Sequence, residues 1–517
     1  MASARTWEVH PDGSGDAPTI CAAVDSSADG DTILLGNGVF QGPGNREIDL
    51  GSLHITLLSE DRDPELCIID CEEAGWGILW MGEGTLEGFT VRNGYAELSG
   101  IAGGIRTGGL GEREIRNCRI ERCVSECRSG GVHATDGIFR LEDCEFFGCR
   151  GDPAALWVSG HAHARIVRCQ VCSCTANVSS CAVLADEYSV SEWEDVDVIS
   201  CVRTGLSLGN GDDSRATFTR CNVRDCTWTG LEMVGYVWAR LYDREISQNR
   251  GNSGGGVYVY TDWGSPSSPA VVMERCKIFD NHSGIWGGAI YLDLGYVRLE
   301  ECLVEGNTAG YGGGIYAFQG VLDLPGTKVR GNWAGYRGGG IFIDSRCPVR
   351  DGVVTGNQAG WWGGGVFSDS YEAELTRCTI AGNHSIRGGG GLYVPWPGST
   401  TICLDNCLIW GNRSDSGGDQ AWLGEGNQAI FNCCDIDSSG ILGPPVTWES
   451  GNLFTDPLFC DPRSPDEAPT IEGDYSLQDC SPCANSPECG LIGALGVGCS
   501  GTATHQTSWG AVKKLFR

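Results

Sequence analysis

A phrase built from asparagine and glycine returns every 25 residues in the second half of the chain. Three copies begin at Gly306, Gly331 and Gly356, and each runs from an asparagine through a glycine triplet into Ile or Val and an aromatic residue. The asparagine position continues forward to Asn412 and backward to Cys123, with cysteine replacing asparagine in the earlier copies. Successive corners lie 23 to 32 residues apart, and a repeat of this length indicates a solenoid.

Each repeat contains about three short runs in which apolar and polar residues alternate, for example 288–292, 296–300 and 302–304. Alternation over so few residues predicts half-buried strands, and no apolar stripe of helical period accompanies them. Strands joined by glycine corners without helices predict a parallel β-helix, an all-β solenoid whose coils lie about 4.8 Å apart. The thirteen corners from Asn93 to Asn412 then predict a rod roughly 60 Å long.

The repeated residue types have a structural explanation in such a stack. Identical side chains lie above one another, so the asparagines can form a hydrogen-bonded ladder and the apolar residues a continuous core. The glycine triplets permit positive φ and close backbone approach at the corner. No Lys-Ser or Lys-Thr follows a glycine run, so the triplets do not match a phosphate-binding loop.

The chain is strongly acidic, with 36 Lys and Arg against 67 Asp and Glu and a net charge of −31. This charge disfavours nucleic acid, anionic lipid and polyanionic glycans as partners. Residues 1–6 are too short for a signal peptide, and no run of 18 apolar residues suggests a transmembrane segment. We expect an extracellular, periplasmic or outer cell-surface monomer, with the export signal outside this chain. Calcium is the one metal cofactor that the acidic surface suggests.

Of the 28 cysteines, thirteen lie in the two repeat columns and five form a second group. Those in the repeat columns are small enough to fill the coil interior as free thiols, but neighbouring coils also lie at disulfide spacing. Zinc is disfavoured, because the cysteines do not form two spaced Cys-x2-Cys pairs. The second group lies close together after the repeats and consists of Cys460, Cys480, Cys483, Cys489 and Cys499. This density predicts disulfides and an oxidising compartment. Because five is an odd number, Cys433 or Cys434 is expected to be an additional partner.

The repeats divide the chain into four parts. Residues 1–45 are expected to form an N-terminal cap, with a short helix over Ile20–Ser26 capped by Thr19. Residues 46–430 form the β-helix, regular from about 101 to 430. Residues 431–499 form a disulfide-rich C-terminal cap, and 500–517 a basic tail.

The repeats resemble those of a known superfamily over roughly residues 75–440. The Asn corner followed by Gly-Gly-[Gly/Ala]-[Ile/Val]-[Tyr/Phe] is similar to the right-handed parallel β-helix repeats of the pectin-lyase-like superfamily. The Gly287-Gly288-Ala289-Ile290 phrase also resembles repeats of polymorphic outer-membrane proteins. The resemblance implies a right-handed coil. It implies no single activity, because such folds include lyases, hydrolases, esterases and non-catalytic adhesins, and the pectinesterase catalytic phrases are missing.

The strand after each glycine triplet predicts an aromatic outer face. The residue after the glycines points inward and the next points outward. The outward column is aromatic in six successive coils: Tyr258, Tyr291, Tyr316, Phe342, Phe367 and Tyr393. Corner tryptophans flank the same edge: Trp286, Trp361 and Trp362. These side chains form either a stacking ladder that stabilises the sheet or an exposed platform for sugars.

Three aspartates, Asp293, Asp344 and Asp369, lie two residues after the outward aromatic residue of their coils. Asp344 and Asp369 belong to adjacent coils and are expected about 5 Å apart, with Asp293 roughly 10 Å from Asp344. Such separations suit a glycosidase carboxylate pair or a calcium site, although solvated surface aspartates follow the same pattern.

Three functions are compatible with these patterns. The first is a secreted or cell-surface protein that binds a polysaccharide or surface glycan through the aromatic and acidic face. The second is a polysaccharide lyase or glycoside hydrolase that uses the three aspartates. The third is a structural spacer. The missing catalytic phrases favour the first.

Overall fold

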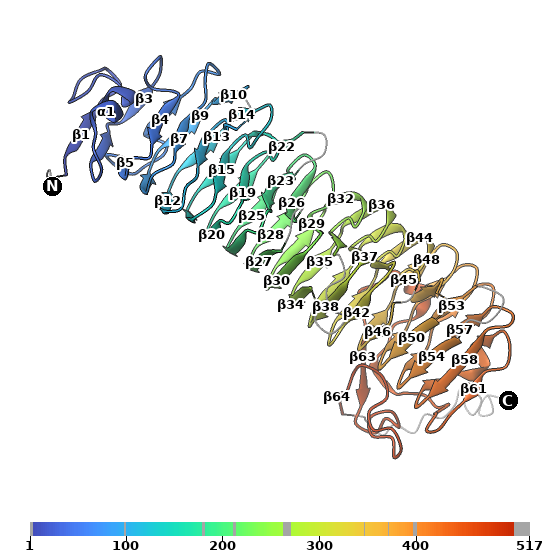
Figure 1. Ribbon diagram of the computed structural model, residues 1–517. Coiled ribbons are helices and arrows are strands. Elements are labelled where there is room, and N and C mark those ends of the chain that lie inside the picture. Colours follow the sequence, from blue (N-terminus) through green and yellow to red (C-terminus); the bar gives the residue numbers. More distant parts are fainter. Residues whose placement is uncertain are drawn as a thin grey trace, which may run out of the picture.

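The computed structural model describes residues 4–97, 100–177, 181–209, 213–261, 270–345, 347–370, 372–395 and 401–500. The chain winds into a rod of stacked coils (Figure 1). Three long sheets run along the rod. The first has 18 strands, from β1 (Thr6–Val9) to β61 (Thr447–Trp448). The second, from β3 (Gly38–Phe40) to β59 (Asp435–Ile436), and the third, from β4 (Ile48–Gly51) to β60 (Ile441–Leu442), have 16 strands each. The prediction of an all-β parallel β-helix is confirmed. The sheets hold more strands than the thirteen expected coils, because the irregular coils at both ends lack the corner residues.

One coil shows how the sequence pattern becomes structure. The strands are β37 (Ile290–Leu294), β38 (Tyr296–Glu300), β39 (Leu303–Glu305) and β40 (Thr308–Tyr311). In the long sheets every strand pairs in parallel with the equivalent strand one coil away, as β38 does with β42 (Val321–Asp323). Alternate side chains such as Val297 and Leu299 are fully buried, so the core is a continuous apolar column inside the coils.

The glycine triplets serve the two purposes expected of them. Gly338 has a φ of +66°, which a residue with a side chain rarely adopts. A Cβ on the next residue, Gly339, would collide with the carbonyl oxygen of Gly364 in the following coil. The triplets therefore allow the corners of successive coils to lie against one another.

The predicted asparagine ladder is present and buried. The side-chain amide of each asparagine donates to the next asparagine's Oδ1, at 3.0 Å for Asn307 to Asn332 and 3.0 Å for Asn332 to Asn357. The same amide also donates to a main-chain carbonyl of a neighbouring coil, such as Val304 for Asn332 at 2.9 Å. Each rung thus fixes the register between two coils.

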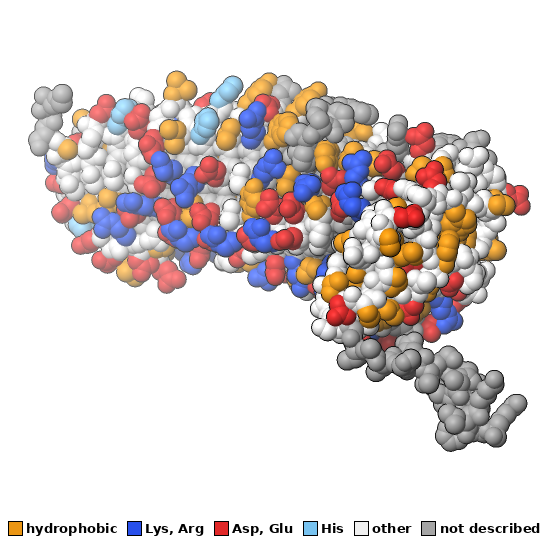
Figure 2. All heavy atoms as spheres, turned by 90° about the horizontal axis from the view of Figure 1, so that it is seen from below, with side chains coloured by type: hydrophobic (Ala, Val, Ile, Leu, Met, Phe, Trp, Pro, Cys, Tyr) orange, Lys and Arg blue, Asp and Glu red, His pale blue; other side chains and the backbone are white. Residues whose placement is uncertain are grey.

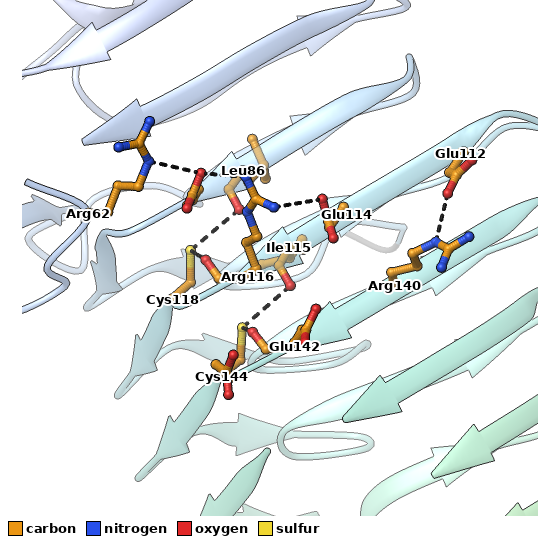
Figure 3. Close-up of polar contacts among 12 residues, drawn as sticks. Arg62, Leu86, Glu112, Glu114, Ile115, Arg116, Cys118, Arg140, Glu142 and Cys144 are labelled. Carbon is orange, nitrogen blue, oxygen red and sulfur yellow. Dashed lines mark hydrogen bonds and ion pairs between the residues drawn. The ribbon is translucent and has the colours of Figure 1, made fainter. Parts of the chain in front are cut away.

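Cysteines occupy the corresponding interior columns in the first half of the rod, and they are free thiols. Their thiols lie close to main-chain carbonyls. Cys118 Sγ is 3.8 Å from Leu86 O, and Cys144 Sγ is 3.6 Å from Ile115 O (Figure 3). Of the two alternatives for these columns, the structure contains the free thiols.

One interior position of a cysteine column holds arginine instead. Arg244 is 1% exposed, and its Nε donates to Cys221 O at 3.1 Å. Its two terminal nitrogens have no hydrogen-bond partner among the described residues. Burial lowers the pKa of this guanidinium, because the low-dielectric interior disfavours its charge.

Replacing Arg244 by methionine is therefore expected to stabilise the protein. An apolar side chain of similar length removes the desolvation penalty, and the free energy of unfolding should rise by about 2 kcal/mol. Urea unfolding would measure this, with Arg240→Met on the exposed face of β30 (Val237–Tyr242) as the control. A loss of stability in Arg244→Met alone would show that the guanidinium has partners inside the folded protein.

Both ends carry extra segments. The N-terminal helix α1 (Ile20–Ser26) has the expected bounds, and Thr19 accepts from the Ala22 amide at 3.2 Å. The C-terminal strands β62 (Phe459–Asp461), β63 (Asp474–Gln478) and β64 (Val497–Cys499) pack beside the last coils (Figure 1). Disulfides join Cys433 to Cys489 and Cys460 to Cys499, which confirms a bridge from the dense cysteine group to Cys433. The tail from 501 to 517 lies outside the described residues.

Charged side chains cover one long side of the rod in alternating signs (Figure 2). Some of the pairs connect neighbouring coils, such as Arg140 with Glu112 at 2.7 Å (Figure 3). At one series of corners an arginine meets the aspartate of the previous coil, with 2.7 Å between Arg220 and Asp195. Most acidic groups on this side are thus neutralised locally. In the described residues, no helix is long and apolar enough to cross a bilayer.

Candidate functional site

The predicted outward aromatic column forms along the third sheet. Tyr258 of β33 (Val257–Tyr260) is in register with Tyr291 of β37, and the series continues through β41 (Ile315–Ala317), β45 (Ile341–Ile343), β49 (Val366–Ser368) and β53 (Leu392–Val394). Ring centroids lie 5.3 Å apart for Tyr291 and Tyr316, and 4.8 Å apart for Phe342 and Phe367. The column is therefore a continuous series of rings in contact.

Of the two alternatives for this column, a stabilising ladder or an exposed platform, the structure contains a covered ladder at four of the six positions. Tyr316, Phe342, Phe367 and Tyr393 are only 6%, 3%, 0% and 8% exposed. The reason is a second layer of side chains over the column. The rings of Tyr311 and Phe342 are 5.8 Å apart, those of Trp362 and Tyr393 are 5.6 Å apart, and Arg337 lies over Phe367. Only Tyr258 and Tyr291, at the N-terminal end of the column, are half-buried.

The second layer presents an aromatic surface, which we call the aromatic shelf. It follows the corner strands β36 (His282–Trp286), β40, β44 (Trp333–Arg337) and β48 (Gln358–Ala359) of a 7-stranded sheet. Its members are Trp286, Tyr311, Tyr336, Trp361 and Trp362. The rings of Tyr336 and Trp361 meet edge to face at 4.7 Å, and Arg387 lies 4.6 Å above Trp361. Trp286 is 37% and Tyr336 is 42% exposed.

The aspartates lie at the opposite ends of the third-sheet strands from the shelf. Tyr258 donates its hydroxyl to Asp293 Oδ2 at 3.2 Å, and Tyr316 donates to Asp344 Oδ2 at 2.7 Å. Burial raises the pKa of the Tyr316 hydroxyl, and the Asp344 carboxylate raises it further. Asp369 follows β49, and its amide donates to Ile343 O at 2.7 Å. The structure thus joins Asp293 and Asp344 to the aromatic column through tyrosine hydroxyls.

A pocket of about 540 Å³ lies at the N-terminal end of the shelf. It forms where the outward column changes from Glu232 of β29 (Leu231–Val234) to Tyr258 in the next coil. Its charged and aromatic lining consists of Arg203, Trp228, Glu232, Tyr258, Trp286, Tyr291 and Asp293. Asp293 reaches it from a β-bulge, since Val259 pairs with Leu292 and Tyr260 pairs with Leu294.

Burial dominates the electrostatics of both carboxyl groups in this pocket. It raises the pKa of Glu232, against a smaller opposing effect from a hydrogen bond with Ser207. It also raises the pKa of Asp293, against hydrogen bonds from Tyr258 and Tyr291 that favour the carboxylate. Glu232 occupies the outward column in the sequence pattern, but it was not predicted as a site residue. The only available signal was its position directly before the first tyrosine of the column.

The outward column has a different character further toward the N-terminus. His133 is 2% exposed, stacks on Trp157 at 4.1 Å and lies 3.0 Å from Ser159 Oγ through Nε2. Burial lowers the pKa of this imidazole to about 2, so it is neutral at physiological pH. His133 therefore acts as a packed core side chain. In the described part of the chain, no three His, Cys, Asp or Glu side chains converge to hold a metal ion.

Comparison with known proteins agrees with the fold. A family model described as a right-handed β-helix region matches residues 154–334. No curated protein sequence matches the chain. A solved structure of the periplasmic alginate epimerase AlgG is 12% identical with a TM-score of 0.32, covering 72% of this chain and 76% of its own. Pectate lyase Pel9A is 11% identical with a TM-score of 0.24, covering 96% of this chain and 98% of its own.

A third solved structure, the tailspike protein 3 of bacteriophage CBA120, is 13% identical with a TM-score of 0.30, and the match covers 84% of this chain and 57% of the tailspike. The family match agrees with the β-helix fold, and the three solved structures, at these TM-scores, assign nothing further to this chain.

Proposed function

We propose that this right-handed parallel β-helix is a secreted or cell-surface protein that binds a polysaccharide along the aromatic shelf. The observation that carries the proposal is the double aromatic layer. Trp286, Tyr311 and Trp362 contact rings that are themselves buried. Tyr336 and Trp361 in turn contact Tyr311 and Trp362, so the shelf is held in place before any ligand arrives. Contiguous exposed aromatic surface commonly marks a binding site, and a rigid one loses little entropy on binding.

The surroundings of the shelf fit a sugar chain. Aromatic faces accept the apolar C–H surfaces of sugar rings, while aspartates beyond the tyrosines offer hydrogen-bond acceptors for hydroxyl groups. The shelf crosses successive coils, so it is elongated along the rod axis like an extended polymer. The net charge of −31 favours a neutral or cationic glycan over a polyanionic one.

Substitution of a shelf tryptophan tests the proposal. Trp361→Ala is expected to weaken glycan binding at least about 10-fold, because it removes one stacking face. A glycan array with and without calcium would identify the ligand, and calorimetry on the purified full chain would measure the affinity. The control is Trp238→Ala, which removes the same side chain from the first sheet, outside the shelf, at a position that is 37% exposed. Equal losses in both variants, or no binding to any glycan, would refute the proposal.

Cleavage of the bound glycan is the second candidate, favoured by the raised pKa of Asp293. A carboxyl group whose pKa is raised holds its proton to a higher pH and can serve as a general acid. An assay for reducing ends and unsaturated products on each array ligand would detect it. Activity lost in Asp344→Asn and Asp369→Asn would assign the aspartates a catalytic role, whereas binding without product would leave the adhesive function.

A further inference from the structure

The pocket at the N-terminal end of the shelf combines aromatic faces with carboxyl groups. The ring centroids of Tyr258 and Tyr291 are 5.4 Å apart, and those of Trp286 and Tyr291 are 5.9 Å apart, with interplanar angles of 41° and 31°. The Tyr258 hydroxyl also donates a hydrogen bond to Asp293 Oδ2 at 3.2 Å. The three rings thus form adjoining walls on one side, and Glu232 extends from the strand before them.

The charged groups that face this pocket are two acids and one base. Glu232 and Asp293 line it from β29 and β37, and Arg203 lines it from the corner before β26 (Thr204–Gly209). The Arg203 guanidinium lies 4.5 Å above the Trp228 ring, so a cation already occupies that aromatic face at the rim. The faces of Tyr258, Tyr291 and Trp286 have no such cation among the described residues.

Both acids lie in surroundings that disfavour their charged forms, since burial is the largest cause of their raised pKa values. A cation placed between them would offset that penalty, because an opposite charge nearby favours the carboxylate. Ring faces also attract cations through their quadrupoles, most strongly where water is excluded. A neutral occupant would instead leave Arg203 at the rim as the only cation that faces the two acids among the described residues.

We propose that this pocket binds an ammonium group carried by the glycan, as in a polysaccharide that contains de-N-acetylated amino sugars. The inference rests on the proposed glycan binding and specifies its chemistry. The shelf supplies stacking for any sugar ring, and the pocket selects a chain with a positively charged unit. An N-acetylated unit carries no charge and is larger at the same position, so the pocket discriminates against it. The acidity of the whole chain adds long-range attraction for a cationic polymer.

Calorimetry with two oligosaccharides of equal length tests this selectivity. Glucosamine and N-acetylglucosamine oligosaccharides would each be titrated into the full chain. The native protein is expected to prefer the glucosamine form at least about 10-fold, and Glu232→Gln, which keeps the side-chain size, is expected to remove most of that preference. Glu192→Gln, an exposed acid on the first sheet, is the matched control and should change nothing. Trp361→Ala should weaken both oligosaccharides alike.

The pH dependence provides a second readout. The folded-state pKa values of Glu232 and Asp293 are raised, so both groups protonate while unperturbed carboxyl groups remain charged. Affinity for the glucosamine oligosaccharide should therefore fall as the pH drops through this range, while affinity for the acetylated form stays level.

The outcomes separate the two proposals. Equal affinity for both oligosaccharides, unchanged in Glu232→Gln, would overturn the ammonium pocket and leave the shelf in place. Free glucosamine, added alone as a probe of the pocket, should bind weakly to the native protein and not to Glu232→Gln. If neither oligosaccharide nor glucosamine binds, the ammonium pocket is overturned, and the glycan array alone then decides whether the shelf binds a glycan. Preference for the acetylated form would reverse the assigned selectivity.

Discussion

Replacing Asn332 by alanine is expected to lower the free energy of unfolding by about 4 kcal/mol. Asn332 is a central rung of the buried ladder. Its Oδ1 accepts from the main-chain N–H of Asn307 at 3.0 Å and from the Asn307 amide at 3.0 Å. Its own amide donates to Val304 O at 2.9 Å. Alanine removes these partners from the buried main-chain N–H of Asn307 and from the Val304 carbonyl, and each unsatisfied group costs about 1–3 kcal/mol. The Asn307 amide keeps its bonds to Ile278 O and Glu305 O.

The matched control is Gln358→Ala, at the corner one coil further along. The Gln358 side chain is half-buried, and its amide lies 3.3 Å from His384 Nδ1. We expect its loss to change stability by less than about 0.5 kcal/mol. Urea unfolding would compare the variants, and hydrogen exchange would locate the damage in the coils next to Asn332, since each coil contacts only its neighbours. Native stability in Asn332→Ala would mean that water or rearrangement satisfies the freed groups.

Replacing Phe367 by alanine is expected to cost about 4 kcal/mol and to disorder the aromatic shelf. Phe367 is fully buried between Phe342, at 4.8 Å, and Tyr393, at 5.6 Å. Its removal leaves a cavity that the rigid coils cannot close. The Arg337 guanidinium, which lies 5.1 Å above the Phe367 ring and 4.9 Å from Trp362, loses part of its support. Glycan affinity should therefore fall together with stability.

A combination of unfolding and binding measurements checks this coupling. Phe147→Ala removes the same side chain from a position that is 44% exposed on the second sheet, and it should leave both stability and affinity nearly unchanged. Phe367→Leu retains most of the buried volume and should restore most of the stability while affinity stays reduced. If Phe367→Ala loses stability but binds glycan normally, the shelf does not depend on the buried column.

The fold and its internal asparagine ladder could be predicted from the sequence, because every coil repeats the same short sequence pattern. A 25-residue period with an asparagine corner and a glycine triplet places equivalent residues above one another, and the parallel pairing follows from that stacking. The ladder through Asn307 and Asn332 needs no further information, since identical side chains at strand spacing reach one another. The bounds of the helix Ile20–Ser26 were equally local, set by the Thr19 cap.

The candidate site was only partly predictable. Alternation with period two tells which side of a strand a residue occupies, but not what covers that side. Phe342 and Phe367 were therefore assigned correctly to the outer face, but whether that face was covered or exposed stayed open, because the covering residues come from the preceding corner. That corner's path depends on the packing of glycines and tryptophans across coils, which no single repeat specifies.

Tertiary contacts alone determined the pocket and the disulfide pairs. Glu232 and Asp293 belong to coils on either side of the coil that carries Tyr258, and Asp293 enters the pocket through a bulge. Cys433 pairs with Cys489 across 56 residues, and Cys460 pairs with Cys499 across 39, in a segment without the repeat. A repeat dictates contacts at its own period because the same short phrase is present on both sides. Contacts between unlike segments depend on the folded path of the whole chain, and so they appear only in three dimensions.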